Sequence, residues 1–197
     1  MSQRIAFFDF DGTITTKDTL LEFIKFIKGP FNFYLGFLLN SPWLVAYKLK
    51  LISNQAGKER ILTWFFGRTT PEKFASHCVD FSTRELPALL RPKALEEIES
   101  LRQKGFDIVI VSASPEDWLR PWTETTGLSL LASRLEIKDN KLTGKITGRN
   151  CHGKEKVSRI KEKYDLSAYT DIYAYGDTSG DRPMLGLATI SFYKPFR

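Results

Sequence analysis

The chain has 197 residues, of which 42% are hydrophobic and 26% are charged, and this composition excludes a disordered tail or a fibrous repeat and indicates a globular protein with a core of its own. The formal net charge is +6. The basic residues form no cluster with interleaved aromatic side chains, so nucleic acid is not expected as a partner, whereas phosphorylated substrates and acidic lipid headgroups stay open. Two distant cysteines, Cys78 and Cys151, cannot build a disulfide framework, and the N-terminus has no signal-peptide cleavage site, so we expect a cytoplasmic protein.

Four short apolar runs are typical of buried parallel strands, and they alternate with helical patterns. The predicted strands are Arg4 to Phe10, Phe106 to Ser112, Asp171 to Tyr175 and Ala188 to Tyr193. The helices predicted between them are Pro92 to Lys104, with Gly105 as its C-terminal stop, Lys154 to Lys163, and Pro183 to Leu187. This alternation predicts an α/β fold with a doubly wound parallel sheet.

A long segment, residues 16–90, separates the first predicted strand from the first of these helices and contains no convincing strand. It is helical and aromatic in pattern, and Thr70-Pro71 is a good helix start. We therefore predict a helical cap at residues 16–90, inserted into a catalytic core of residues 1–15 and 91–197. Residues 135–147 alternate apolar and polar around Asp139-Asn140, which predicts a β-hairpin appended to the core.

One part of the predicted cap is unusually apolar. Residues 29–47 carry no charge and six aromatic side chains, and Asn40-Ser41-Pro42 divides them into two halves, each too short to span a membrane, which takes about 20 apolar residues. Two interpretations stay open. The segment forms two cap helices packed on each other, or residues 31–47 make a peripheral contact with a membrane, with Trp and Tyr at headgroup depth.

Two acids stand at the end of the first predicted strand, Asp9 and Asp11, separated by Phe10. In an extended chain their side chains start from one face and can share one site. A bare pair of this kind would repel itself and raise a pKa, which a divalent cation or a shared proton would relieve. Gly12 then lets the backbone pass close to a ligand.

At these residues the chain resembles the haloacid dehalogenase-like phosphatases, whose signature DxDGT stands here as Asp9 to Thr13. Three further motifs of that family follow in order: a strand that ends in serine, a lysine that opens a helix, and an acidic pair after a strand. They match Ile108 to Ser112, Gly153 to Lys156, and Gly176 to Asp181. The position of the insertion resembles the phosphoserine-phosphatase-like branch (subfamily IB) with its small helical cap. The string Asn150 to Gly153 resembles a part of that branch that includes a bacterial phosphatidylglycerophosphate phosphatase.

The resemblance implies roles for the matching residues. Asp9 would attack phosphorus and form a phosphoaspartyl intermediate, and Asp11 would act as general acid and then as general base. Ser112 would donate to a phosphoryl oxygen, and a lysine would neutralise charge on the transferring group. The family spacing favours Lys156 over Lys154 for that lysine.

The resemblance also implies a cofactor, Mg²⁺. Asp9, the backbone carbonyl of Asp11 and Asp177 would hold the ion, because Mg²⁺ prefers oxygen ligands, and Asp181 would lie behind them in the outer shell. In the fourth motif Gly180 stands where the family often has asparagine.

The substrate-binding residues expected from the resemblance are Asp18, Ser112 and Ser114. Asp18 stands where phosphoserine phosphatases have a glutamate that meets the substrate ammonium, but its side chain is shorter and it follows Lys17. Ser114-Pro115 is the expected start of a helix, with Ser114 as its N-cap, so the N–H groups of that helix would lie beside a phosphate.

Three functions remain as hypotheses. The first is a magnesium-dependent hydrolase of small phosphomonoesters. The second is a lipid phosphatase of the phosphatidylglycerophosphate phosphatase type, acting at the cytoplasmic face of the inner membrane. The third, from another class, is a non-catalytic regulatory protein that binds phosphate.

Overall fold

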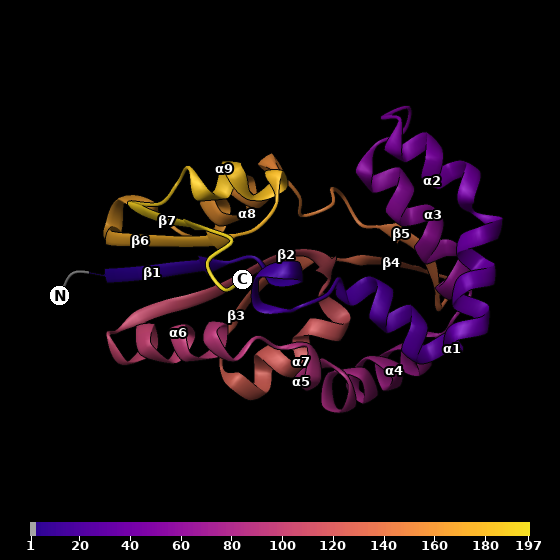
Figure 1. Ribbon diagram of the computed structural model, residues 1–197, viewed down its shortest axis with the longest axis horizontal. Coiled ribbons are helices and arrows are strands. Elements are labelled where there is room, and N and C mark those ends of the chain that lie inside the picture. Colours follow the sequence, from indigo (N-terminus) through magenta and orange to yellow (C-terminus); the bar gives the residue numbers. More distant parts are fainter. Residues whose placement is uncertain (1–2) are drawn as a thin grey trace.

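The computed structural model describes residues 3–197. Its centre is a five-stranded sheet in which all neighbouring strands run parallel (Figure 1). In spatial order the strands are β3 (Ser129–Ser133), β2 (Phe106–Pro115), β1 (Gln3–Phe8), β6 (Tyr169–Gly176) and β7 (Ile190–Tyr193).

Helices cover both faces of this sheet because the central strand β1 is apolar on both sides. Ala6 and Phe8 belong to one buried cluster, and Ile5 and Phe7 belong to a second. The first cluster includes residues of α6 (Pro92–Gln103) and α7 (Glu116–Thr126), and the second includes residues of α8 (Lys154–Lys163) and α9 (Arg182–Leu185). The predicted doubly wound α/β fold is confirmed.

The predicted elements are found, with differences at their ends. Strand β1 stops at Phe8, two residues earlier than predicted, because the chain leaves the sheet and turns through η1 (Phe10–Ile14). Strand β3 was not predicted, since its five residues include only a short apolar stretch between two serines. Helix α7 begins at Glu116, so the prediction that Pro115 opens it was wrong: Pro115 ends β2.

The segment predicted as a cap is helical. It contains α1 (Thr19–Leu39), α2 (Ser41–Lys48), α3 (Asn54–Phe66), α4 (Pro71–Arg84) and α5 (Leu86–Leu89). Its two ends lie side by side, because Thr15 and Leu90 form an antiparallel bridge and the N–H of Arg91 donates to the carbonyl of Ile14 at 2.8 Å. Thr70 caps α4 as predicted, accepting from the N–H of Lys73.

The insertion does not stand apart from the sheet domain. The ring of Phe23 in α1 stacks on Trp118 of α7 with centroids 4.7 Å apart. At the other side, the predicted hairpin is confirmed as β4 (Leu135–Lys138) and β5 (Lys141–Ile146), turning at Asp139 and Asn140, both with positive φ. The hairpin lies against α3 and is bonded to it, since Thr63 donates to the carbonyl of Thr143, so it connects the cap to the core.

The uncharged segment is split as predicted, because α1 ends at Leu39 and α2 begins at Ser41. Helix α1 also bends at Gly29, whose φ is +74°. Phe37 packs on Phe65 of α3, but much of the rest of the segment is exposed. Within residues 3–197, we find no helix that combines the length and apolar character needed to cross a bilayer.

Candidate active site

The carboxyl edge of the sheet brings the predicted acids together. Asp9 follows β1, its N–H donates to the carbonyl of Tyr175 in β6 at 2.9 Å, and only 6% of its surface is exposed. The backbone then turns through Gly12, with φ of +82°. A Cβ at this position would lie 2.6 Å from Oδ2 of Asp177. A glycine is therefore needed for the turn to pass this close to the second acid.

Lys156 projects from the first turn of α8 into the same place and is 1% exposed. Its Nζ donates to Oδ1 of Asp9 at 2.5 Å and to Oδ1 of Asp181 at 2.8 Å. Burial alone would lower the pKa of this lysine, but the two carboxylates raise it above its ordinary value. Lys154, the other candidate, is exposed. The geometry therefore favours Lys156 as the lysine of the site.

Asp9 itself is an unusual carboxyl group. Burial raises its pKa to about 7, although the charge of Lys156 acts in the opposite direction, and the neighbouring charge of Asp181 adds to the increase. A carboxylate that is both desolvated and held by an ammonium group is typical of a functional site rather than of a surface turn.

Asp177 and Asp181 differ in their partners. Asp177 follows β6, and the hydroxyl of Thr13 lies 3.3 Å from its Oδ1 and 3.2 Å from Oδ2 of Asp9. Asp181 ends the short helix η3 (Ser179–Asp181), where its Oδ2 accepts from the N–H groups of Asp177 and Thr178. Burial would raise the pKa of Asp181, but Lys156 and these hydrogen bonds lower it below its ordinary value.

The donor set fits a divalent cation such as Mg²⁺. Carboxylate oxygens of Asp9, Asp177 and Asp181 lie within 4.8 Å of one another, and such hard oxygen donors are what this ion prefers. Each of the three carboxylates also has a protein partner at both of its oxygens, so these contacts do not rank the three acids as ligands. The guanidinium group of Arg197 pairs with Oδ2 of Asp177, which shows that this edge attracts positive charge.

Asp11 has partners from both the insertion and the core. Its Oδ1 accepts from the N–H and hydroxyl of Thr19 at 2.7 and 2.6 Å, and its Oδ2 accepts from the hydroxyl of Ser114 at 2.7 Å. The expectation that Asp9 and Asp11 start from one face of an extended strand was wrong, because β1 ends at Phe8, before both acids, and Asp11 lies within η1. Three hydrogen bonds therefore fix the carboxylate of Asp11, two from Thr19 of the insertion and one from Ser114 of β2.

Ser112 and Ser114 both lie near Asp11. Ser112 is fully buried, and its Oγ accepts from the N–H of Ser114 at 3.0 Å and lies 3.5 Å from Oδ2 of Asp11. Ser114 does not cap α7, so that prediction was wrong: its side chain makes no cap hydrogen bond, and its hydroxyl instead holds Asp11.

Asp18 begins α1. Its carboxylate accepts from the N–H of Leu21 at 3.2 Å, so it is the N-cap of that helix. Desolvation raises the pKa of Asp18 to about 6, and the charge of Asp11 adds to the increase. Lys17 pairs with Glu22 rather than with Asp18. Asp18 therefore already has a structural role, because its carboxylate caps α1.

Sequence reasoning missed one side chain at this edge. Lys58 of α3 reaches from the insertion to the end of β2, where its Nζ donates to the carbonyl of Ala113 at 3.0 Å. A lysine on a helix is usually solvated, and no motif or spacing in the sequence around Lys58 predicts its contact with Ala113. Only the packing of α3 on the hairpin, which no local pattern predicts, brings it there.

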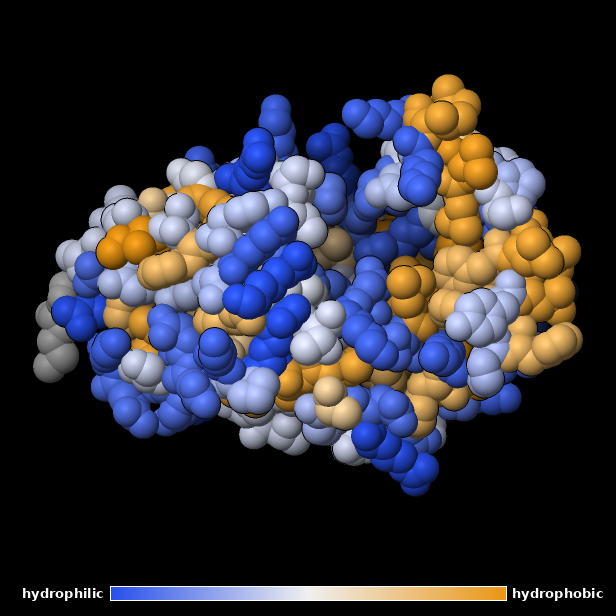
Figure 2. Space-filling model, in the orientation of Figure 1, coloured by the Kyte–Doolittle hydropathy of each residue, from blue (hydrophilic) through white to orange (hydrophobic). Residues whose placement is uncertain are grey.

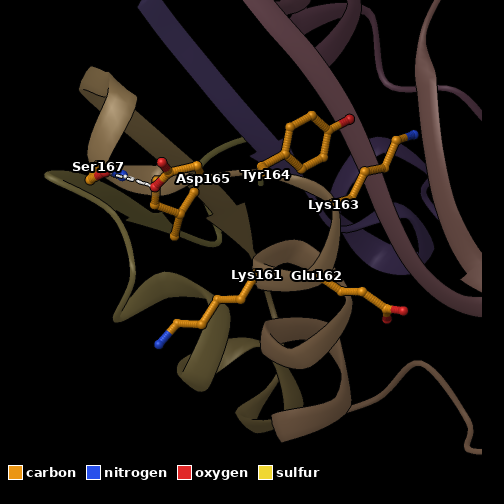
Figure 3. A pocket seen from close by; sticks show the side chains of 7 residues that line it. Lys161, Glu162, Lys163, Tyr164, Asp165 and Ser167 are labelled. Carbon is orange, nitrogen blue, oxygen red and sulfur yellow. Dashed lines mark hydrogen bonds between the residues drawn. The ribbon is translucent and has the colours of Figure 1, made fainter.

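A separate pocket lies at the far end of α8 and is lined by residues 161–167 (Figure 3). There Lys161 and Lys163 extend in different directions, and a hydrogen bond joins Asp165 to Ser167 at the start of η2 (Leu166–Ala168). The residues that line this pocket precede β6 in sequence, so the pocket lies at the amino edge of the sheet. The acidic cluster at the opposite edge is the better candidate for chemistry, since ligands of such sheets bind at the carboxyl ends of the strands.

Two carboxyl groups with opposite surroundings therefore face one space. Asp9 is held by an ammonium group beside two further acids, an arrangement suited to a nucleophile whose charge must be controlled. Asp11 is held by hydroxyl and N–H donors from Thr19 of the insertion and Ser114 of β2, an arrangement suited to proton exchange.

Comparison with known sequences agrees with these features. The model of a family described as haloacid dehalogenase-like hydrolase matches residues 6–186. Protein CicA of Caulobacter vibrioides is 36% identical over 194 residues, which cover 96% of this chain and 85% of that protein.

Solved structures share the fold. A protein of unknown function from Bordetella pertussis superposes with a TM-score of 0.85 at 20% identity, covering 97% of this chain and 89% of that one. A phosphoserine phosphatase, solved as an analogue of its phospho-aspartyl intermediate, superposes with a TM-score of 0.68 at 19% identity, covering 97% and 86%. The predicted likeness to the phosphoserine-phosphatase-like branch is confirmed at the level of fold. With the family match over most of its length, this chain is an enzyme of the haloacid dehalogenase-like hydrolase family.

Proposed function

We propose that this protein is a magnesium-dependent phosphomonoester hydrolase that works through a phosphoaspartyl intermediate on Asp9. The observation that carries the proposal is the position of the Asp9 carboxylate, which is buried at the end of β1 and bonded to Lys156, with Asp177 close by. The phosphoserine phosphatase of similar fold, solved as a phospho-aspartyl intermediate analogue, supports the same chemistry here.

Each side chain then has one task. Asp9 attacks phosphorus while Asp11, in its protonated form, gives its proton to the departing ester oxygen. Asp11 next takes a proton from the water that attacks the aspartyl-phosphate, which returns Asp9 and releases inorganic phosphate. Hydrogen bonds from Thr19 and Ser114 hold the Asp11 carboxyl group in one orientation.

A lysine and a metal site together neutralise the negative charge of the phosphoryl group. Lys156 neutralises the transferring group and holds Asp9, and Ser112 supplies a hydroxyl at the end of β2. Asp9, Asp177 and the Asp11 carbonyl would hold Mg²⁺, which when bound supplies positive charge to the phosphoryl oxygens. Such a complete set favours an enzyme over a regulatory protein that only binds phosphate.

We retain the proposed division into a core of residues 1–15 and 91–197 and a cap of residues 16–90. The bridge between Thr15 and Leu90 supports these limits, because the chain leaves the core and returns to it at neighbouring points.

The test is hydrolysis of p-nitrophenyl phosphate and a panel of natural phosphomonoesters, with and without Mg²⁺. We expect turnover that disappears after treatment with EDTA and returns with Mg²⁺. Activity that persists after thorough chelation would overturn the assignment of the metal. A complete lack of hydrolysis across the panel would overturn the proposed phosphomonoester hydrolase activity.

A second candidate function is a lipid phosphatase that works at an anionic membrane surface, and one surface feature favours it. We call this feature the apolar face of the cap. On α1 it follows one side of the helix, with exposed side chains at helical spacing, and it continues over α2 and the turn after it as the orange region in Figure 2. Its residues are Phe31, Tyr34, Leu35, Leu38, Leu39, Trp43, Val45, Tyr47, Leu49 and Leu51, which are 40–76% exposed.

The charges around the apolar face suit an anionic lipid surface. Between residues 23 and 58 the chain has five lysines and no acidic residue. Lys25 and Lys28 precede the apolar face in sequence, and Lys48 and Lys50 alternate with its last residues, Leu49 and Leu51. Each basic residue near an anionic surface contributes about 1 kcal/mol to binding. An apolar face of this size on a helix is otherwise expected to be buried.

The membrane proposal is tested by sedimentation with vesicles of phosphatidylglycerol and of phosphatidylcholine. We expect binding to the anionic vesicles at low salt, partial release at high salt, and a blue shift of fluorescence that is missing in Trp43→Phe. Leu38→Asp should weaken binding, whereas Val79→Asp, at an exposed apolar position of α4, should not. Failure to bind anionic vesicles at low salt would contradict the proposal.

A further inference from the structure

The segment after β7, residues 194–197, lies at the carboxyl edge of the sheet (Figure 1). The N–H of Lys194 donates to the carbonyl of the last residue of β6 at 2.8 Å. Two residues later, the carbonyl of Phe196 accepts from Nη1 of Arg91 at 3.4 Å, and the Phe196 ring stacks on Tyr175 with centroids 5.8 Å apart. Backbone and ring contacts therefore fix this segment beside the acidic cluster.

Arg197 follows these anchors and reaches into the cluster. Its Nη2 donates to Oδ2 of Asp177, and the two side chains form an ion pair. Within residues 3–197 the Arg197 side chain has no other hydrogen bond or ion pair. The side chain of Asp177 is 5% exposed, whereas that of Arg197 is 47% exposed. A long, half-exposed side chain with one polar partner can move into solvent at little cost, since an ion pair of this kind is weak.

The oxygen that Arg197 contacts is the one nearer to the turn at Gly12. A Cβ on Gly12 would lie 2.6 Å from Oδ2 of Asp177 and 3.2 Å from Oδ1. The carbonyl of Asp11, which we propose as a further metal ligand, belongs to this turn. The guanidinium group of Arg197 therefore holds the Asp177 oxygen on the side of that proposed ligand.

Two cations of unequal burial neutralise the three acids of the cluster. Lys156 donates to Asp9 and Asp181 and is 1% exposed, whereas Arg197 pairs with Asp177 from the surface. With all three acids ionised, the carboxylates and the ammonium group leave two negative charges, which is the amount that a divalent cation neutralises. The guanidinium group halves this amount, and its charge repels a metal ion at the same carboxylate.

We propose that Arg197 competes with the metal ion for Asp177: its guanidinium group neutralises this acid in the metal-free protein and leaves Oδ2 when Mg²⁺ binds. This inference rests on the metal site of the proposed function and adds a regulation of that site, because the concentration of Mg²⁺ decides which cation Asp177 holds. Lys156, buried and bonded to two acids, stays in place in both states.

Titration calorimetry with Mg²⁺ alone tests the competition, since it needs no turnover. Arg197→Gln should bind Mg²⁺ with a Kd about 3- to 10-fold lower than that of the wild type, the range of an ion pair with one exposed partner. Lys194→Gln is the matched control. It removes one charge from the same segment, but Nζ of Lys194 lies over the ring of Tyr193, so its Kd should stay within about twofold of the wild-type value.

Thermal unfolding in EDTA and in saturating Mg²⁺ distinguishes competition from a purely structural ion pair. In EDTA, Arg197→Gln should lower Tm by about 2–4 °C, because it leaves the buried carboxylate of Asp177 without its partner. In saturating Mg²⁺ the variant and the wild type should unfold at the same temperature, since Asp177 then holds the metal ion in both. A structural ion pair would keep the same difference in Tm under both conditions, and that result would overturn the inference.

The calorimetric result also separates this inference from the proposed function. Weaker binding of Mg²⁺ by Arg197→Gln would show that Arg197 orients Asp177 for the metal ion, and an unchanged Kd would show that the ion pair does not oppose binding; either result would overturn the competition, even if esters are hydrolysed. If Arg197→Gln binds Mg²⁺ more tightly but neither protein hydrolyses any phosphomonoester, the proposed function fails and the competition stands.

Discussion

The ammonium group of Lys156 lies 2.5 Å from the carboxylate of Asp9, and both side chains are buried at the carboxyl edge of the sheet. Asp181 approaches the same ammonium from the other side at 2.8 Å. The lysine therefore does two things at once. It compensates two desolvated acids, and it fixes the direction of the carboxylate that we propose as nucleophile.

Replacement of this lysine should affect both rate and stability. Lys156→Ala should lower kcat by about 10²- to 10³-fold, as the loss of one charge-stabilising contact does in a water-poor site. It should also reduce the free energy of unfolding by about 3–5 kcal/mol, because it leaves buried carboxylates uncompensated. Lys154→Ala, at an exposed position on the same helix, is the control and should change neither. Steady-state kinetics and urea unfolding measure both effects, and a larger loss of rate at Lys154 would reverse the assignment.

The acids at this edge should bind Mg²⁺ in the absence of substrate. Mg²⁺ at about 100 times its Kd would stabilise the fold by about 2.7 kcal/mol, which for a chain of this size raises Tm by about 5–10 °C. Asp9→Asn and Asp177→Asn should lose most of this shift, and Asp9→Asn should in addition lose turnover, because an amide is a poor nucleophile.

Differential scanning calorimetry with and without Mg²⁺ checks this. Asp165→Asn is the matched control, since that acid lies at the other end of α8 and bonds only with Ser167 among its described contacts. A shift retained in both Asp9→Asn and Asp177→Asn would show that the ion binds elsewhere.

The N-cap of α1 should make stability depend on pH. The pKa of Asp18 is raised to about 6 from 3.8, so between these values the folded state holds a proton that the unfolded state has released. Ionisation of Asp18 therefore costs stability as pH rises from about 4 to 6. The side chain is partly open to solvent, so the effect should be about 1 kcal/mol or less.

Asp18→Asn keeps a good N-cap but has no charge. Relative to wild type, this variant should gain stability as pH rises from 4 to 7, and urea unfolding at several pH values measures the difference. Equal pH profiles for the two proteins would contradict it. If kcat/KM for aminoethyl phosphate falls selectively in the variant, Asp18 contacts a substrate ammonium after all.

The sheet and the acids at its edge could be predicted from sequence because both depend on local patterns. Short apolar runs mark the strands, and the residues that follow β1 and β6 carry the acids. Parallel strands end at one edge, so Asp9 and Asp177 had to meet there. Lys156 could be chosen over Lys154 by motif spacing alone, and the structure places it accordingly.

The side of the site that faces the cap could not be predicted in this way. The direction of Asp11 depends on where the strand stops, and the bonds from Thr19 and Ser114 form only after three separate segments meet. Lys58 reaches Ala113 because α3 packs on the hairpin, a contact between residues far apart in the chain. The arrangement of these residues is a property of tertiary packing.

The contact between the hairpin and α3 leads to a last prediction, which concerns Gly144. This residue has φ of +81°, and a Cβ there would lie 2.3 Å from the Cα of Thr63. Gly144→Ala should therefore lower the free energy of unfolding for two reasons. The left-handed backbone costs about 1 kcal/mol. The clash, which only a backbone shift relieves, costs roughly a further 1–3 kcal/mol.

Gly148 is the matched control, because its φ is also positive, at +73°, but nothing lies within 4 Å of the position of its Cβ. Gly148→Ala should show only the backbone cost, about 1 kcal/mol. Unfolding free energies from urea titration give the difference between the two variants, which is the part due to packing of the hairpin on α3. Equal destabilisation by the two substitutions would show that the hairpin does not pack closely on α3.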